Sequence, residues 1–479
     1  MKTTVASRRA AGLKAAALPV GALILFLITI LIFKGADGIA PLAPVALAVA
    51  SLTALIVARR YGPIRRRAMK SGLARSARQV LPAIPMLLCI AALSTTWMLS
   101  GVVPTLVDYG LQWLNPRWFP LTVCAISAVV SILTGSSWST IATIGVSFMG
   151  IGELMGFSAG WIAGAVISGA YFGDKISPLS DTTVVAASTC GVDLFRHIRY
   201  MLLTSIPAFS IALAVYALAG TLTDTEIASH TPEFLSELHR LYNISPYTLI
   251  IPALTLTLIL LRINTLITLA ISALAGAAGV FIFQKGYPAA SLLKDVVIGH
   301  TASAENELLS SLLSTGGILG MLPTVMLVVC AMIFGGVMMG TGFLGILSNR
   351  LGRRLKTRGT IVSATVAGGL SANACTADQY LSIIITGNMF KGLYRKQGLE
   401  NRLLSRTVED SVSVTSVLIP WNSCGVTHSA VLGVATTIYF PFCVFNYMSP
   451  VMSILMARMA NIKMKNYRLN RKKVVISQP

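Results

Sequence analysis

A charged segment interrupts otherwise apolar sequence at residues 168 to 183, which read SGAYFGDKISPLSDTT. It places Asp174, Lys175, Pro178 and Asp181 within eight positions, and no other charged residue occurs from 154 to 192. A charge at the centre of a bilayer costs roughly 2.5 to 17 kcal/mol, so three charges beside a helix-breaking proline indicate a functional requirement. The pattern predicts an ion or substrate site on a broken helix.

The residue types around Pro178 are those that bind a hard cation. A proline leaves backbone carbonyls without their helical partners, and these combine with hydroxyl and carboxylate oxygens into a shell that suits such an ion. Burial favours the neutral form of a carboxyl group, so a proton can compete with the cation. We therefore expect Asp174 and Asp181 to bind Na+. Further oxygen ligands are expected from Ser137, Ser177 and Thr182.

A simpler interpretation of the same segment stays open. Asp174 and Lys175 could end an ordinary helix at the membrane surface, with Asp181 capping the next helix. The long uncharged stretches on both sides argue against it, because placing the segment outside the bilayer removes two membrane spans.

A second polar set follows a similar plan in the C-terminal part of the chain. Pro420 breaks another apolar run, and Asp378 and Asp410 are the candidate ion-binding carboxylates. For Glu409 and Asp410, which closely follow Arg406, the alternative is an ordinary cytoplasmic helix start. An organic solute would need a fixed positive partner and polar contacts. The candidates for that role are Lys175, Asn373, Trp421 and Asn422, with His428 as a further one.

Composition places the whole chain in the membrane. Hydrophobic residues make up 54% of the 479 positions and charged residues only 11%, against about 25% in soluble domains. The net charge of +21 does not predict nucleic-acid binding, because the basic residues gather at the ends of apolar runs and no recognition motif accompanies them. The expected partner is the lipid bilayer, and the sequence is compatible with an oligomer.

Other function classes find little support. The seven cysteines stand singly in apolar sequence, which predicts core packing rather than disulfides or a metal site. The five histidines form no metal motif, and neither a nucleophile elbow nor a phosphate-binding loop occurs. We expect no enzymatic activity and no cofactor.

Basic segments predict the orientation of the chain. Eight arginines and lysines lie in residues 59 to 78 and five in residues 350 to 358, and a basic tail follows residue 458. The positive-inside rule assigns these segments, and both termini, to the cytoplasm. Residues 221 to 245 carry four acidic residues and are expected outside. The apolar run from Ala15 to Phe33 is too long for a signal peptide and predicts an uncleaved first span.

The predicted fold is all-α and polytopic, with inverted repeats and broken helices at the membrane midplane. One transporter domain over residues 1–479 would contain N-terminal helices (1–110) and two repeat cores (118–220 and 356–456). The repeats are expected at offsets of 234 to 236 residues, with Asp174 opposite Asp410 and Cys190 opposite Cys424. Helices are predicted near 17–33, 39–58, 80–103, 120–134, 138–155, 159–173 continuing at 182–191, 200–220, 246–262, 264–283, 317–345, 360–373, 376–390, 411–420 with a continuation, and 428–456.

Four ordered motifs resemble those of a known family. They are GSSWSTIATIG, SGAYFGDKISPLSDTT, ADQYLSIIITGNMF and LSRTVEDSVSVTSVLIPWNSCG, within residues 80 to 456. In this order they are similar to the signatures of the NhaC-type sodium/proton antiporter family of the ion-transporter superfamily. The resemblance implies a bacterial inner-membrane secondary transporter that moves Na+ and H+. Thr386 and Asn388 depart from the family pattern, in which a proline and an arginine are expected.

Sodium/proton antiport is the function we expect, through competition of Na+ and H+ for membrane-embedded carboxylates in an alternating-access carrier. The alternative is coupled transport or exchange of an organic acid, of the malate/lactate type, or of an amino acid. Proteins similar to this family carry such solutes, and the departures at Asn388 and His428 favour this alternative.

The predicted orientation can be tested with single cysteines introduced at Arg66 and Glu233. In whole cells an impermeant thiol reagent should label the Glu233 position and leave the Arg66 position unlabelled, because only the former is expected to face outward. Labelling of the Arg66 position from outside would contradict the topology.

Overall fold

The structure of the protein is a computed structural model that describes residues 2–34, 39–61, 66–81, 83–222, 231–261, 263–284, 286–302, 310, 313–343 and 357–459. Parts of the predicted topology lie outside these residues. They are residues 347–356 of the second basic loop, the acidic positions Asp224 and Glu226, and the basic tail from residue 460.

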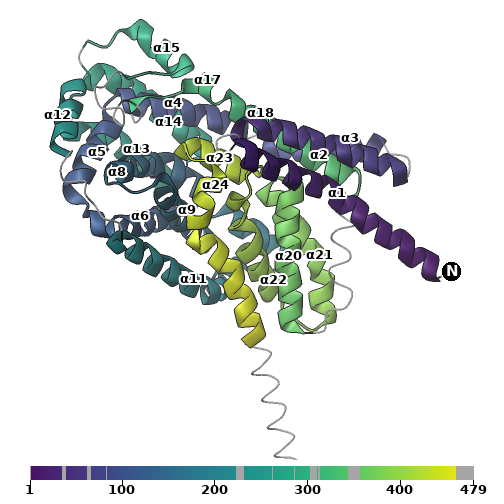
Figure 1. Ribbon diagram of the computed structural model, residues 1–479. Coiled ribbons are helices and arrows are strands. Elements are labelled where there is room, and N and C mark those ends of the chain that lie inside the picture. Colours follow the sequence, from purple (N-terminus) through teal and green to yellow (C-terminus); the bar gives the residue numbers. More distant parts are fainter. Residues whose placement is uncertain are drawn as a thin grey trace, which may run out of the picture.

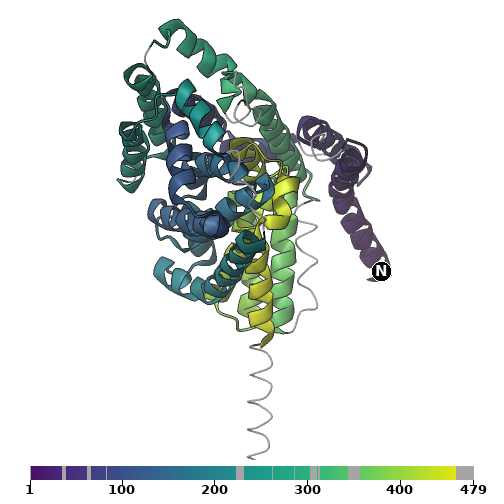
Figure 2. The ribbon, with the colours of Figure 1, turned by 60° about the vertical axis from the view of Figure 1, so that its left-hand side comes forward.

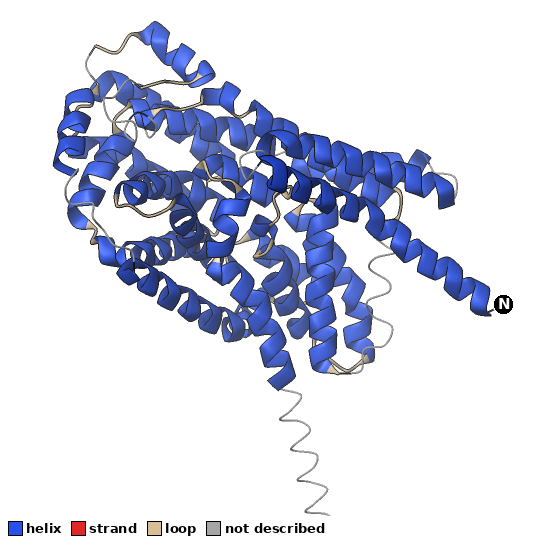
Figure 3. Ribbon diagram, viewed as in Figure 1, coloured by secondary structure: helices blue, strands red, loops and turns tan. Residues whose placement is uncertain are grey.

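Helices dominate the described residues, in which no strand occurs (Figure 3). Among the described residues, six helices are long and apolar enough to cross a membrane, and up to nine spans result if each of three sharply bent helix pairs counts as one. The predicted all-α, polytopic membrane class is therefore confirmed.

The N-terminal helices form one flank of the molecule (Figures 1 and 2). Helix α1 (Lys2–Lys34) packs on α2 (Ile39–Tyr61), while α2 and α3 (Arg66–Val80) both pack on α18 (Leu322–Gly340). The sequence predicted only a basic loop at 59–78, whereas residues 66 to 80 form a helix. Its small and apolar residues contact α18 and its arginines are mostly exposed, which is the pattern of an amphipathic helix.

A bent pair follows, formed by α4 (Ala83–Leu99) and α5 (Val102–Trp113) with an angle of 67° between them. Gly101 adopts a left-handed φ of 84° at the bend. The helix predicted near 80–103 is therefore two helices, and the second extends to Trp113. Asp108 on this helix is buried and contacts His239 Nε2 at 2.9 Å.

The first core block contains the first predicted site. Its elements are α6 (Phe119–Thr134), α7 (Ser137–Thr140), the π-helical turn η3 (Ile141–Gly145), α8 (Val146–Leu154), α9 (Ala159–Ile176), α10 (Asp181–Cys190) and α11 (Leu194–Leu222). Helix α9 extends through Asp174 and Lys175, beyond its predicted end at 173. The chain leaves helical geometry around Pro178, as predicted, and resumes it at Asp181.

The second core block lies beside it at the C-terminal end (Figure 1). Its elements are α20 (Arg358–Thr376), α21 (Gln379–Lys396), α22 (Asn401–Val408), the π-helical turn η6 (Glu409–Ser413), the short η7 (Ser416–Leu418), α23 (Ser423–Leu432), α24 (Thr436–Tyr439), η8 (Phe440–Phe442) and a last helix, Val444–Met459. The interruption at Pro420 is confirmed. The predicted helix over 411–420 is wrong, because helical geometry begins at Asn401 and gives way to a turn at Val414.

The two blocks share their backbone plan at a spacing of 242 residues. Ser136 and Asp378 both cap the helix that follows, and each accepts a backbone N–H from the residue three positions on. Ser180 and Asn422 cap α10 and α23, which both have ten residues. The hydroxyl pair of Thr134 and Thr140, 3.3 Å apart, has its counterpart in Thr376 and Ser382, 2.6 Å apart. The predicted offsets of 234 to 236 are therefore out of register, and Asp174 does not correspond to Asp410.

The remaining helices connect the blocks along the upper side of Figure 1. They are α12 (Thr231–Leu241), η5 (Pro246–Leu249), α13 (Ile250–Leu260), α14 (Thr265–Phe283), α15 (Ala289–Ile298), α17 (Gly317–Gly320) and α18.

Glycines allow the closest helix contacts. In α3, a Cβ atom added to Gly72 would lie 2.7 Å from the backbone nitrogen of Gly340 on α18. Gly336 and Gly340 in turn face Leu73 and Met69, and Gly160 and Gly164 face Phe442, so these glycine pairs serve close packing.

Replacing Gly72 by alanine should lower the apparent melting temperature of the detergent-solubilised protein by several degrees, because the added methyl group forces α3 away from α18. The control is Gly392→Ala, since a Cβ atom there meets nothing within 4 Å on helix α21. Alanine is the better helix former by roughly 1 kcal/mol, so the control should be no less stable than the parent chain. Equal melting temperatures for both variants would contradict the close contact.

Candidate functional site

Asp174 lies near the C-terminal end of α9 and is almost fully buried. Its Oδ2 accepts the backbone N–H of Ser137 at 3.1 Å and the hydroxyl of Ser137 at 2.6 Å. Ser137 is held there because Gly135 ends α6 in the left-handed conformation and Ser136 caps α7. The structure thus brings together Asp174 and Ser137, which the sequence predicted as parts of one site.

The break after α9 supplies hydroxyl groups. Ser180 and Thr182 lie 3.0 Å apart through their hydroxyl oxygens, and both are buried. Thr183 donates its hydroxyl to the carbonyl of Lys175 at 3.0 Å, which ties α10 back to α9 across the break. Asp181, in the first turn of α10, is exposed and close enough to Asp174 to interact with it electrostatically.

Ser177 is placed differently from its predicted role. Its hydroxyl donates to the carbonyl of Ile132 on α6 at 2.8 Å, and its oxygen accepts the N–H of Leu179 at 3.3 Å. These contacts fix the path of the chain through the break and turn the hydroxyl toward α6.

Lys175 makes a buried ion pair with Asp410, which comes from the other block. Its ammonium group also donates to Ser449 Oγ at 2.8 Å and lies 5.5 Å from the ring centroid of Phe445. Asp410 Oδ1 accepts the hydroxyl of Thr204 on α11 at 3.1 Å. These five side chains come from four elements that are distant in the sequence: α9, α11, η6 and the last helix.

A second buried cation approaches the same carboxylate. Arg406 Nε lies 3.7 Å from Asp410 Oδ2, and the guanidinium carbon lies 4.8 Å from the ring centroid of Tyr200. Arg406 is only 2% exposed. The sequence analysis treated Arg406 as the mark of a helix start at the membrane surface, and its burial is contrary to that interpretation.

Glu409 is the site residue that the sequence analysis misjudged most. It is fully buried in the π-helical turn η6, and neither carboxylate oxygen has a hydrogen-bond partner among the described residues. Lys175, Thr182 and Ser413 interact with it electrostatically, as does the carboxylate of Asp174. The hydroxyl of Ser413 is likewise buried without a partner within the described chain. A buried polar group of this kind calls for an explanation such as a bound ion.

Asp378 and Asn373 lie at the start of the second block's break. Asp378 Oδ1 accepts the N–H of Leu381 at 2.8 Å as the cap of α21. Asn373 Nδ2 donates to the carbonyl of Val412 at 2.8 Å, while its Oδ1 is buried without a partner among the described residues. Tyr380 interacts electrostatically with Asp174, Asp181 and Asp378, so it lies between the acidic residues of the first block and that of the second. No local sequence pattern marked Tyr380.

The remaining candidates for a solute site are occupied by structural contacts. Trp421 Nε1 donates to the carbonyl of Ala374 at 2.8 Å, and Asn422 caps α23 and donates to the carbonyl of Asn373 at 3.3 Å. His428 Nε2 lies 3.0 Å from the Tyr171 hydroxyl. Trp421 and Asn422 thus link the second break to α20, and His428 links α23 to α9.

The two breaks bring buried oxygen atoms together. Within the described part of the chain, no three His, Cys, Asp or Glu side chains are close enough to hold a metal ion. Asp174 and Glu409, with the hydroxyls of Ser180, Thr182 and Ser413, instead present hard oxygen atoms of the kind that a hard cation accepts.

Comparisons with known proteins agree with this chemistry. The model of the Na+/H+ antiporter family matches residues 5–200 and 169–460. The chain is 37% identical to the Na+/H+ antiporter NhaC of Alkalihalophilus pseudofirmus, over 75% of this chain and 78% of the relative. It is 34% identical to the malate-2H+/Na+-lactate antiporter of Bacillus subtilis, over 78% and 80%. It is 33% identical to the arginine/ornithine antiporter ArcD of Halobacterium salinarum, over 92% and 90%.

These matches cover most of the chain and most of each relative. They identify a transporter rather than an enzyme. The chain belongs to the Na+/H+ antiporter family.

Proposed function

We propose that this protein exchanges Na+ for H+ by binding them in turn at the buried carboxylates of Asp174 and Glu409. The observation that carries the proposal is the charge balance of one buried cluster. Three carboxylates, those of Asp174, Glu409 and Asp410, face two cations, Lys175 and Arg406. With all five ionised the cluster has one excess negative charge, and either one Na+ or one proton neutralises it.

Exchange follows if the cluster binds either Na+ or H+ but not both at the same time. A buried charge without a partner is unfavourable, so the cluster is most stable when one of the two ions is bound. The carrier then changes its access in a loaded form, which makes the movement of one ion depend on that of the other.

The backbone around the cluster suits this task. Both helices are interrupted beside it, at Ser177 to Ser180 and at Val414 to Asn422, and such breaks provide carbonyl groups for a cation. Glu409 is fully buried and Asp174 is 7% exposed, so an ion reaches them only when the surrounding elements move. Asp181 is exposed beside Asp174 and is our candidate for attracting the cation to the entrance.

Exchange of an organic solute is the second candidate function. Two relatives are named as antiporters of malate and lactate and of arginine and ornithine, and this supports keeping it. The geometry favours it less, because Lys175 is paired with Asp410 and therefore is not free to bind a solute carboxylate.

The expected setting is a bacterial inner membrane with both termini in the cytoplasm. The basic segments support it, since they follow the positive-inside rule.

Flux measurements in proteoliposomes test the proposed site. Asp174→Asn and Glu409→Gln should each abolish sodium-driven proton movement, because the cluster no longer needs a bound ion. Asp181→Asn should retain turnover at saturating sodium with a weaker apparent affinity, since its carboxylate lies at the entrance. Glu153→Gln, at an exposed acid of α8, is the matched control and should exchange normally. Normal exchange by Glu409→Gln would refute its role.

The same assay separates the two candidate functions. Sodium alone should drive proton movement in the parent protein. If sodium alone is inactive and flux requires malate, lactate or an amino acid, exchange of an organic solute is the correct function.

The ion pair of Lys175 and Asp410 can be tested with a double-mutant cycle. Removing one partner of a buried pair costs about 3 to 5 kcal/mol, so Lys175→Gln and Asp410→Asn should each lower the melting temperature strongly. Asp410→Asn should be the more damaging because it leaves Arg406 unpaired as well. The double variant should be more stable than the sum of the two losses predicts. Strictly additive losses would show that the side chains do not interact.

A further inference from the structure

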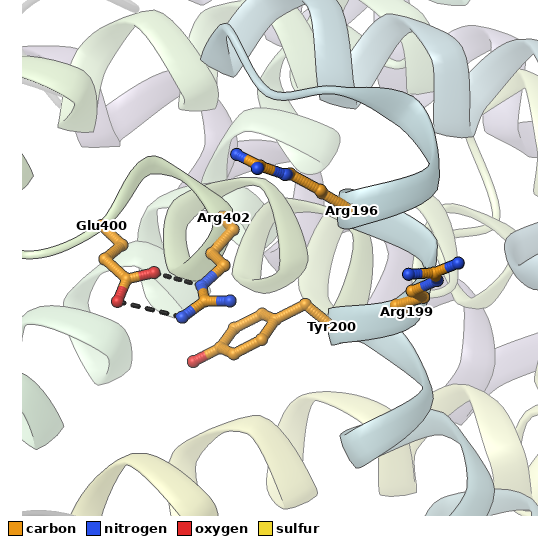
Figure 4. Close-up of a pocket in the computed structure, with 5 residues that line it drawn as sticks. All are labelled: Arg196, Arg199, Tyr200, Glu400 and Arg402. Carbon is orange, nitrogen blue, oxygen red and sulfur yellow. Dashed lines mark hydrogen bonds and ion pairs between the residues drawn. The ribbon is translucent and has the colours of Figure 1, made fainter.

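A pocket of about 560 Å³ lies between the start of α11 and the start of α22 (Figure 4). The carboxylates of Asp174 and Glu409 do not line it. Its lining consists of Arg196, Arg199, Tyr200, Glu400 and Arg402. Three arginines face one glutamate, so the lining carries two net positive charges. Such a pocket suits an anion.

One arginine of the pocket has partners within it. Arg402 Nη2 donates to Glu400 Oε1 at 3.1 Å, and its guanidinium carbon lies 4.9 Å from the ring centroid of Tyr200. Tyr200 also packs against Arg406 and accepts a hydrogen bond from Arg358 Nη2 at 3.0 Å. Tyr200 therefore lies against two arginines, Arg402 and Arg406, and bonds to a third, Arg358.

The other two arginines are available. Within the described residues, Arg196 and Arg199 make no side-chain ion pair, although Arg402 in the same pocket does. In Figure 4, Arg196 extends from α11 toward the side where Arg402 and Glu400 lie. Guanidinium groups bind phosphate oxygens through two parallel N–H donors, so this arrangement matches a phosphate group better than a simple halide.

The surroundings of the pocket indicate where the phosphate comes from. Helix α11 is a candidate membrane span over Leu194–Leu222, which places Arg196 and Arg199 in its first turns, at the interface. Leu203 and Ile206, both 53% exposed, lie four and seven positions after Arg199 and share its face of the helix. An apolar stripe thus leads from the pocket toward the membrane interior, as the acyl chains of a lipid require.

We propose that this pocket binds the phosphodiester headgroup of an anionic phospholipid whose acyl chains lie along α11. General attraction of arginines to lipid does not need a pocket, whereas the fixed stack of Arg402, Tyr200 and Arg406 provides a defined geometry. The bound lipid would join α11 to α22, the helix that leads into η6.

Thermal-shift titrations of the purified full-length protein in detergent test the proposal. Phosphatidylglycerol should raise the melting temperature, while zwitterionic phosphatidylcholine and inorganic phosphate should have little effect. In Arg196→Gln/Arg199→Gln, the apparent affinity for phosphatidylglycerol should fall by about tenfold or more, as expected for the loss of charge-assisted hydrogen bonds. The matched control is Arg395→Gln/Lys396→Gln, which removes two exposed charges from the end of α21 and should bind normally.

A variant that should bind more tightly separates a loss of the site from a loss of folding, because a folding defect does not increase affinity. Glu400→Gln removes the negative charge of the pocket and should increase the affinity for phosphatidylglycerol. An unchanged affinity in the Arg196/Arg199 variant, or equal losses in both double variants, would overturn the specific site. A full effect of inorganic phosphate alone would overturn the lipid and leave a free-anion site.

Discussion

The burial of Lys175 against Asp410 is the interaction on which the rest of the site depends. The two residues are 235 positions apart and belong to different core blocks, so their contact fixes how the two interrupted helices meet. An ammonium group is stable at this depth only with a close anionic partner and additional hydrogen bonds. Ser449 accepts a hydrogen bond from the ammonium group and Thr204 donates one to Asp410, which extends the constraint to the last helix and to α11.

This pairing also determines which carboxylates remain available. Because Asp410 is satisfied by Lys175 and approached by Arg406, the neighbouring Glu409 is left without a partner within the described chain. Asp174 accepts the N–H and the hydroxyl of Ser137 at the start of α7 and makes no ion pair among the described residues. The carboxylates of Asp174 and Glu409 therefore stand outside the ion pair, and the proposed exchange uses these two.

Local chemistry made much of the fold predictable. Pro178 and Pro420 lie at the two breaks, as the missing N–H of proline favours, although Pro207 lies within the continuous helix α11. The long apolar runs predict the spans. Long-range contacts were not predictable. Nothing near Lys175 in the sequence points to Asp410, and nothing near Ser177 shows that its hydroxyl faces Ile132. Glu409 was misjudged because the adjacent Arg406 resembles a surface charge, whereas both are buried in the three-dimensional structure.

The common backbone plan of the two blocks carries different side chains, and this has a kinetic consequence. A serine caps α7 where an aspartate caps α21, and α10 begins with Asp181 where α23 begins with Ser423. The acidic residues Asp181 and Asp378 therefore have serines at the corresponding positions of the other block. A carrier with such an asymmetry presents unlike surroundings to an ion arriving from each side of the membrane. Its forward and reverse half-cycles then differ in apparent affinity, while the equilibrium distribution of the ions, which is set by their gradients alone, is the same in both directions.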